Sequence, residues 1–290
     1  MQRFETGRAD ATLVDAGGVR LSVSRVGQGV PVVCLTAIGH GSRDFDAFVE
    51  RLPPGFEAIL VDWPGQGRSE GDTQPASAVR YEGLLARLLQ RLDVSRPILI
   101  GNSIGGAAAI RYAAAHPVRG LVLCDPGGLA AVNGVVRRFC GLFARFFAAG
   151  ERGAAWFPAA FALYYRMVLP SPAAAAQRRR IVAAARETAV VCRQAWESFG
   201  RPEADIRAMA RDLDARVWFA WAGQDRVIPL RFCRPAVDAM RAADLTLFRA
   251  GHSAFLEQPD AFADGFRAFA ASLAEPQTAG TALRRQDQMA

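Results

Sequence analysis

One short motif constrains the fold of this chain more than any other segment: Gly-Asn-Ser-Ile-Gly at residues 101–105. A short apolar run, residues 96–100, precedes it, and an Ala-rich, helix-prone segment, residues 104–116, follows it. A serine between a strand and a helix, with glycine two residues before and two after it, is typical of a nucleophile elbow. The tight turn favours glycine at both flanking positions. Ser103 is therefore the candidate nucleophile, at a helix N-terminus whose free N–H groups favour negative charge.

Two further loops carry the groups that a serine nucleophile requires. The alcohol needs a base to take its proton, and the base needs an acid that orients it. Segment 217–221 predicts a strand, and the loop after it holds Asp225. Segment 245–248 predicts the next strand, and the loop after it holds His252. Because loops after parallel strands meet at one edge of a sheet, we expect Ser103, Asp225 and His252 to converge as a catalytic triad.

Alternatives exist for both the base and the acid. His116 precedes a proline at a predicted helix end, which favours a structural role, and His40 comes earlier in the chain than the usual base. His40 is instead a candidate for lining a pocket. For the acid, Asp125 follows a strand one step earlier than Asp225, and some serine hydrolases carry their acid there. Asp225 is the preferred acid, and Asp125 stays open as the alternative.

Strands and helices alternate along most of the chain. Strands are predicted at residues 12–15, 21–26, 32–35, 58–61, 98–100, 121–124, 217–221 and 245–248. Helices of the same region are predicted at residues 44–52, 78–92, 104–116, 230–242 and 260–273. This order predicts an α/β fold, with a mainly parallel eight-stranded sheet and helices on both of its faces.

The alternation is interrupted once, and the interruption predicts an inserted helical cap, or lid, over residues 127–212. This stretch has no convincing strand and offers helical segments at residues 135–149, 159–168, 174–199 and 203–211. The core is then predicted to comprise residues 1–126 and 213–275. Residues 276–290 have few apolar side chains, so we expect a disordered tail.

The predicted cap is rich in aromatic residues, most of which must pack the cap onto the core. Some of them are candidates for lining an apolar pocket above the serine, namely Trp156, Tyr164 and Tyr165. Asn102, beside the candidate nucleophile, joins His40 as a further pocket candidate. Such a pocket favours a small apolar acyl or aromatic substrate over a sugar or a polar metabolite.

Composition disfavours several other classes of function. The net charge is +7 and all 35 basic residues are Arg, but they are scattered along the chain, so we expect no nucleic-acid partner. Three of the five cysteines lie within apolar runs, which predicts buried thiols, and none has metal-ligand spacing, so we expect no metal. The longest apolar stretch, residues 154–165, is too short to span a bilayer, and the first residues lack the apolar core of a signal peptide. We therefore expect a cytoplasmic protein without stable membrane insertion; its oligomeric state stays open.

Four segments together resemble the α/β-hydrolase superfamily, and the likeness covers about residues 11–273. They are the elbow, the turn Val-Asp-Trp-Pro-Gly-Gln-Gly-Arg-Ser (61–69), the loop Gly-Gln-Asp-Arg-Val-Ile-Pro (223–229) and the loop Gly-His-Ser-Ala-Phe-Leu-Glu-Gln-Pro (251–259). The chain is identified from them as a capped member of that superfamily. The resemblance implies an α/β-hydrolase fold and a triad of Ser103, His252 and Asp225 that needs no cofactor.

Residues 101–106 and 125–129 are also similar to hydrolases that cleave carbon–carbon bonds in ring-fission (meta-cleavage) products of aromatic degradation. Relatives carry His-Gly after the third strand, where this chain has Thr36-Ala37, and those hydrolases carry Trp after the catalytic histidine, where this chain has Ser253. Both departures weaken the match to that subgroup.

The alignment of the loop after the third strand implies an oxyanion hole made by the backbone N–H groups of Ile38 and Ile104. The leading hypothesis is a serine hydrolase of carboxylic esters, thioesters or lactones that works through an acyl-enzyme. A carbon–carbon hydrolase is the alternative, and a non-catalytic binding protein on a hydrolase fold is the third.

Overall fold

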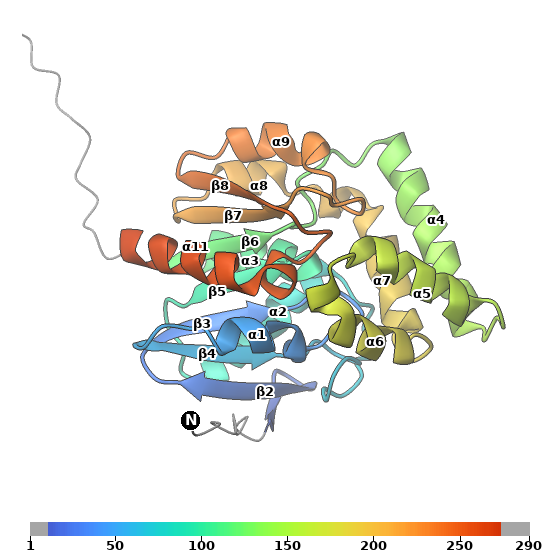
Figure 1. The fold of residues 1–290 in the computed structure, drawn as a ribbon, viewed down its shortest axis with the longest axis horizontal. Helices are drawn as coiled ribbons and strands as arrows, with labels where there is room; N and C mark the ends of the chain where they lie inside the picture. Colours follow the sequence, from blue (N-terminus) through green and yellow to red (C-terminus); the bar gives the residue numbers. More distant parts are fainter. Residues whose placement is uncertain (1–10, 274–290) are drawn as a thin grey trace, which may run out of the picture.

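The computed structural model describes residues 11–273 of the 290-residue chain, so the predicted tail, residues 276–290, lies outside the described residues. An eight-stranded sheet forms the centre of the molecule, with the strand order β1-β2-β4-β3-β5-β6-β7-β8 (Figure 1). The strands are β1 (Thr12–Asp15), β2 (Arg20–Gly27), β3 (Val30–Leu35), β4 (Phe56–Val61), β5 (Ile98–Asn102), β6 (Gly120–Cys124), β7 (Val217–Ala222) and β8 (Ala243–Phe248).

The sheet is mainly parallel, as the sequence predicts. Strand β2 pairs antiparallel with β1 and β4, and every other pair of neighbouring strands is parallel. Every residue of β5, β6 and β7 is buried, which is expected for parallel strands covered on both faces. The eight predicted strands are therefore confirmed, although most extend one or two residues further, in several cases into Gly or polar residues such as Gly120 and Asn102 that carry little apolar signal.

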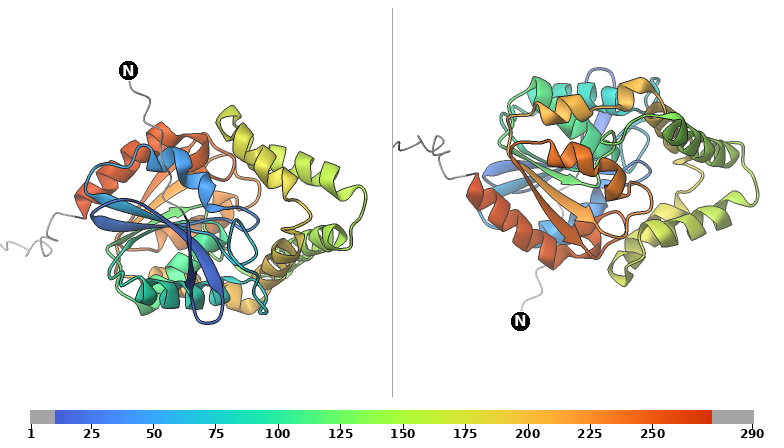
Figure 2. Two further views of the ribbon diagram at one scale, coloured as in Figure 1. Left: turned by 90° about the horizontal axis from the view of Figure 1, so that it is seen from below. Right: turned by 90° about the horizontal axis from the view of Figure 1, so that it is seen from above.

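Helices cover both faces of the sheet, and alternate residues of each strand point to opposite faces. In β3, Val33 and Leu35 pack into one hydrophobic cluster, while Val32 and Cys34 pack into the other. The first cluster includes residues of α2 (Ala78–Arg91), α3 (Ile104–Ala115), α8 (Arg207–Arg211) and α9 (Leu230–Asp238). The second includes residues of α1 (Asp46–Val49), α10 (Ala254–Glu257) and α11 (Pro259–Ser272), and Figure 2 shows the two layers of helices.

Four of the helices between β6 and β7 stand at one side of the sheet, beyond the ends of the strands (Figures 1 and 2). They are α4 (Gly134–Glu151), α5 (Phe157–Val168), α6 (Ala175–Ala183) and α7 (Ala189–Phe199). The sequence predicts one helix over residues 174–199, but the structure has two, α6 and α7, with a turn between them. The Thr188 hydroxyl donates to the Ala184 carbonyl (3.0 Å) in that turn, an option that helix propensity alone does not reveal.

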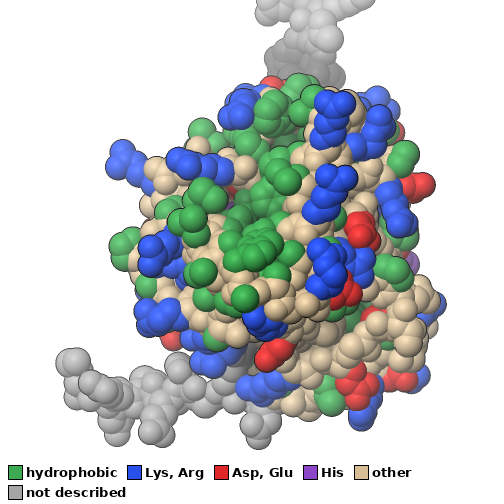
Figure 3. Space-filling model, turned by 90° about the vertical axis from the view of Figure 1, so that its right-hand side faces the viewer, with side chains coloured by type: hydrophobic (Ala, Val, Ile, Leu, Met, Phe, Trp, Pro, Cys, Tyr) green, Lys and Arg blue, Asp and Glu red, His purple; other side chains and the backbone are tan. Residues whose placement is uncertain are grey.

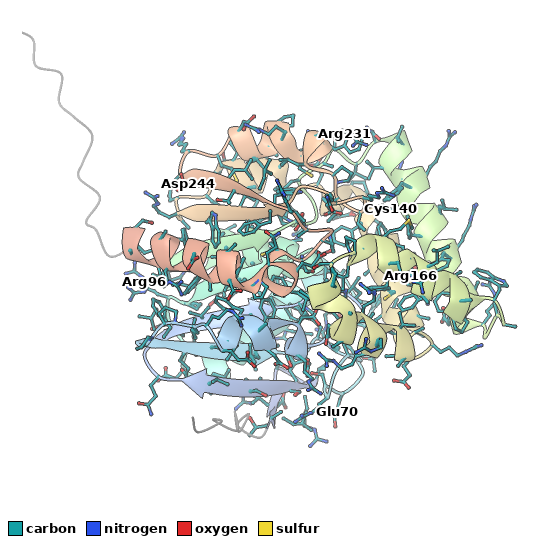
Figure 4. All side chains as sticks on the ribbon, viewed as in Figure 1. Glu70, Arg96, Cys140, Arg166, Arg231 and Asp244 are labelled. Carbon is teal, nitrogen blue, oxygen red and sulfur yellow. The ribbon has the colours of Figure 1, made fainter. Side chains whose placement is uncertain are left out.

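Charges are distributed around the surface. Ion pairs such as Arg216–Asp244 (3.0 Å) and Arg20–Glu70 are exposed, and Glu70, Arg96 and Asp244 lie at separate parts of the periphery (Figure 4). Figure 3 views the side formed by α4 and α5, where hydrophobic side chains gather among Arg side chains. Within residues 11–273, no helix has both the length and the apolar character to cross a bilayer. All five cysteines are free and buried, two more than the three that the sequence predicts to be buried.

Candidate active site

Ser103 occupies a strained turn between β5 and α3. Its backbone has φ 56° and ψ −116°, and positive φ is unfavourable for a residue with a Cβ. Two hydrogen bonds hold this conformation: its N–H donates to the Cys124 carbonyl (3.0 Å), and its carbonyl accepts from the Gly127 N–H (3.0 Å). The loop after β6 therefore fixes the backbone of the candidate nucleophile.

The flanking glycines allow the close packing that the turn needs. A Cβ on Gly101 would lie 2.6 Å from the Gly105 carbonyl oxygen, so no side chain fits there. A Cβ on Gly105 would lie 2.5 Å from the Leu35 carbonyl oxygen. The first turn of α3 is thus in van der Waals contact with the end of β3, which brings the loop after β3 next to Ser103.

His252 and Asp225 form a buried pair. Nδ1 of His252 lies 2.8 Å from Oδ2 of Asp225, and the backbone N–H groups of Val227 and Ile228 donate to Oδ1 of Asp225 at 2.6 and 3.0 Å. Burial raises the pKa of Asp225, but His252 and the two N–H donors outweigh burial, so that pKa lies below its ordinary value. An ionised Asp225 can hold His252 with a proton on Nδ1 and leave Nε2 free as a base.

The histidine loop is hydrogen-bonded directly to the elbow. The Asn102 amide donates to the His252 carbonyl (2.9 Å) and to the Cys124 carbonyl (3.0 Å), and its oxygen accepts from the Ser253 hydroxyl (2.9 Å). Asn102 is fully buried, so its side chain joins the loops that carry Ser103 and His252. The sequence proposes Asn102 as a pocket residue; in the structure its polar atoms face these loops.

Glu257, which sequence reasoning does not single out, fixes the same loop from α10. Its Oε1 accepts the backbone N–H groups of Gly251 (2.8 Å), His252 (3.1 Å) and Ser253 (3.3 Å), and its Oε2 accepts the N–H of Ser171 (3.1 Å). The carboxylate is buried, at 4% exposure. A Glu inside the short apolar segment after the histidine is the one signal in the sequence that could have identified it.

The proposed oxyanion donors lie on the two segments that meet at Ser103. The N–H of Gly39, which follows Ile38, donates to the Gln66 side chain (2.5 Å). The carbonyl of Thr36 accepts from the Trp63 indole (3.0 Å). These two hydrogen bonds hold the loop after β3 on both sides of Ile38. Within residues 11–273, no hydrogen bond occupies the N–H of Ile38 or of Ile104. Both donors therefore remain available for a ligand oxygen.

His40 belongs to a second buried polar group. Its Nδ1 bonds to Oδ2 of Asp44, and the other oxygen of Asp44 accepts from the Gln177 amide of α6. The His40 ring lies 5.6 Å, centroid to centroid, from the ring of Tyr165 in α5. This group connects the loop after β3 to two of the helices beyond the sheet.

The three aromatic pocket candidates differ in position. Tyr165 is buried, and its hydroxyl would lie 3.6 Å from a Cβ on Gly39, so it lies over the loop after β3. Burial raises the pKa of Tyr164, with smaller contributions from Cys192 and Asp225, and its ring packs against the rings of Phe143 and Tyr165. Trp156 is 54% exposed and packs beside Phe146, at the outer part of these helices.

Asp125, the alternative acid, lies beside the same pair. The metal-capable side chains that the described structure brings together are Asp125, Asp225 and His252, whose ligand atoms lie within 4.8 Å of one another. The Asp225 and His252 atoms are already hydrogen-bonded to each other. Oδ1 of Asp125 accepts the N–H of Ala222 (3.0 Å), so this carboxyl also ties the loop after β6 to β7.

The fold of this chain is similar to that of many solved structures. An esterase from Exiguobacterium antarcticum superposes with a TM-score of 0.76 at 17% identity, covering 91% of this chain and 99% of the esterase chain. The enol-lactonase from Burkholderia xenovorans LB400 superposes with a TM-score of 0.73 at 19% identity, covering 90% and 100% of the two chains. At these identities the likeness shows the fold.

Sequence relatives and a family profile complete the comparison. The 2-hydroxy-6-oxo-6-phenylhexa-2,4-dienoate hydrolase of Burkholderia cepacia is 29% identical over 119 residues, which are 39% of this chain and 42% of that protein. The chain spans roughly two fifths of the length of the curated relatives it matches. The profile described as "Alpha/beta hydrolase family" matches residues 23–265. The chain therefore belongs to the alpha/beta hydrolase family.

Proposed function

We propose that this hydrolase cleaves carboxylic esters, or the related thioesters and lactones, through a covalent acyl-enzyme on Ser103. The observation that carries the proposal is the pairing of a strained serine turn with a buried His252–Asp225 couple on loops that are hydrogen-bonded to each other. This arrangement supplies a nucleophile, a base and an orienting acid.

The proposed reaction has two stages. His252 takes the Ser103 proton as the serine oxygen attacks the carbonyl carbon, and the N–H groups of Ile38 and Ile104 receive the developing oxyanion. His252 then returns the proton to the leaving alcohol, which departs and leaves the acyl-enzyme. Water, deprotonated by His252, attacks the acyl-enzyme; the acid is released as His252 returns the proton to the Ser103 oxygen, which regenerates the free enzyme. Asp225 keeps its negative charge throughout and stabilises the imidazolium.

Helices α4 to α7 form the proposed cap and select the substrate. Tyr165 is the best-supported pocket residue, because its ring lies beside that of His40 in the loop after β3, and Tyr164 packs against Tyr165. The aromatic surroundings favour apolar acyl or aromatic groups. We place Trp156 at the outer part of the cap, where it would touch only a long substrate.

A carbon–carbon hydrolase is the second candidate, and one observation favours it. Two relatives are described as hydrolases of 2-hydroxy-6-oxo acids, those of Cupriavidus pinatubonensis (34% identical over 93 residues) and Burkholderia cepacia. Solved structures that cover about nine tenths of this chain include an esterase and a lactonase instead. A non-catalytic binding protein is the least supported reading, because the catalytic groups would have no reason to stay assembled.

The test is a substrate panel assayed with wild type and Ser103→Ala. p-Nitrophenyl esters of increasing acyl length are compared with a 2-hydroxy-6-oxo dienoate ring-fission product. We expect ester turnover that depends on acyl length and on Ser103. Turnover of the dienoate with negligible ester cleavage would select the carbon–carbon hydrolase, and no turnover of either with an intact fold would favour the binding protein.

The compartment proposed for the protein is the cytoplasm. The support is that all five cysteines are free and buried, as is common where thiols are kept reduced. The proposed partner is the small substrate alone, with no nucleic acid.

A further inference from the structure

Asp125 is a buried carboxyl group that the proposed reaction does not use. It is fully buried, and its backbone has a φ of 46°. Its Oδ1 accepts the Ala222 N–H, whereas its Oδ2 is buried and has no hydrogen-bond donor within residues 11–273. A buried carboxylate oxygen without a donor is costly, so the state of this atom requires an explanation.

The neighbour of Asp125 is another carboxyl group. The side-chain ligand atoms of Asp125, Asp225 and His252 lie within 4.8 Å of one another, so the two buried carboxyls are close neighbours. Two carboxylates have only acceptor oxygens, so these neighbours can form a hydrogen bond only if one of them carries a proton. Like charges this close in a buried site do not both ionise.

The surroundings decide which carboxyl holds the proton. Asp225 accepts hydrogen bonds from His252, Val227 and Ile228, and all three stabilise its anion. Asp125 accepts one, from a backbone N–H. Burial raises the pKa of Asp125 well above its ordinary value and the charge of Asp225 raises it further, whereas the pKa of Asp225 is lowered.

The other titratable groups that face Asp125 also disfavour a second negative charge. Glu257 on α10 adds negative potential. Cys124, its chain neighbour, and Cys233 on α9 are neutral thiols: burial raises the pKa of Cys233 to about 12 and raises that of Cys124 well above its ordinary value.

We propose that Asp125 is an un-ionised carboxylic acid whose O–H donates a hydrogen bond to the Asp225 carboxylate, and that it is a positioning residue for the triad acid. The inference rests on the proposed function only in naming Asp225 as that acid. The bond gives the orphaned oxygen its partner and orients the Asp225 carboxylate toward Nδ1 of His252. It also keeps the net charge of the two carboxyls at −1.

The kinetic test compares Asp125→Leu with Asp125→Asn. Leu removes the donor and leaves the Ala222 N–H unpaired, so kcat/KM should fall about tenfold or more. Asn keeps both roles, since its NH2 donates to Asp225 and its carbonyl accepts from Ala222, so it should recover most of that loss. Loss of activity in Asp125→Asn as deep as in Asp225→Asn would overturn the proposal.

The pH dependence of kcat/KM distinguishes a neutral, positioning Asp125 from an ionised one. The acid limb of the kcat/KM pH profile should coincide in wild type and Asp125→Asn, because the substitution removes no charge. If Asp125 were ionised, removing its charge beside His252 would move this limb to lower pH by about one unit or more. Such a shift would contradict the proposal.

Unfolding supplies a readout that needs no substrate. An Asp side chain in the unfolded chain ionises near pH 3.9. Above this pH the folded wild-type protein keeps a proton on Asp125 that the unfolded chain has lost. The free energy of unfolding of the wild type therefore falls as pH rises toward the folded pKa of Asp125. Asp125→Asn has no such proton, so its free energy of unfolding relative to wild type should rise from about pH 5 to about pH 8. A difference that is flat over this range would overturn the proposal. If Ser103 proves not to be the nucleophile, this slope still tests the proton on Asp125.

Discussion

At Gly105 the first turn of α3 leaves no room for a side chain, because a Cβ would lie 2.5 Å from the Leu35 carbonyl oxygen and 2.7 Å from that of Thr36. We expect Gly105→Ala to destabilise the protein by about 1–3 kcal/mol through overpacking. It should also lower ester turnover, since it moves Ile104 relative to Ile38. Denaturant unfolding and a p-nitrophenyl ester assay measure the two effects.

Gly83, in α2, is the matched control for this glycine. A Cβ there meets nothing within 4 Å, so Gly83→Ala should stabilise the protein by about 0.5–1 kcal/mol through helix propensity and leave turnover as it is. If Gly105→Ala and Gly83→Ala destabilised the protein equally, close packing at the elbow would not be the reason for glycine at position 105.

Glu257 is the second position where a single residue has a large expected effect. Its carboxylate accepts four backbone N–H groups, three of them from the histidine loop. Glu257→Gln replaces one acceptor oxygen by an NH2 group that faces N–H donors. It should therefore lower the free energy of unfolding by about 1–3 kcal/mol and reduce kcat by misplacing His252. Exposed Glu187→Gln is the control and should change neither the unfolding midpoint nor kcat. If Glu257→Gln had the stability and kcat of wild type, Glu257 would not be what holds the histidine loop in place.

At the scale of elements, the contact between α6 and the loop after β3 depends on Gln177 and Asp44. Gln177→Ala removes the donor to one buried oxygen of Asp44, so we expect a stability loss of about 1–3 kcal/mol. Amides of α6 should then exchange hydrogen faster, while those of α3 should not. Arg179→Ala, exposed on the same helix, is the control. Unchanged exchange in α6 would show that this bond does not hold the helix to the core.

The elements that the sequence predicts best are those with a strong local signal. The apolar runs at β5, β6 and β7 predict strands because both faces are buried. The helix predicted over residues 174–199 divides into α6 and α7, because tertiary packing overrides helix propensity in the turn around Thr188. The segment predicted at 203–211 shortens to α8, which packs against α3 and α9 on the core.

Across the whole molecule, the candidate site combines residues that a motif identifies with residues that only the fold brings together. Ser103, Asp225 and His252 follow from their positions after strands, since topology alone places such loops at one edge. Glu257 and the contact between Asp44 and Gln177 depend on side chains that fold back across the loops. The sequence offers only a Glu inside a short apolar segment as a sign of the first contact and no sign of the second, so it could not predict their partners.

Across the whole molecule, the three candidate catalytic residues are also nearly buried: Ser103 is 7% exposed, Asp225 7% and His252 3%. If helices α4 to α7 act as the proposed cap, we expect substrate access to require their movement.

The most direct test of the central claim is labelling with a fluorophosphonate, followed by peptide mass spectrometry. The wild-type protein should carry one adduct, on Ser103, and Ser103→Ala should carry none while its unfolding midpoint stays close to that of wild type. In the same samples ester turnover should fall on the order of a million-fold, as is typical when a serine nucleophile is lost. An adduct on another residue, or turnover of Ser103→Ala within about tenfold of wild type, would contradict the account.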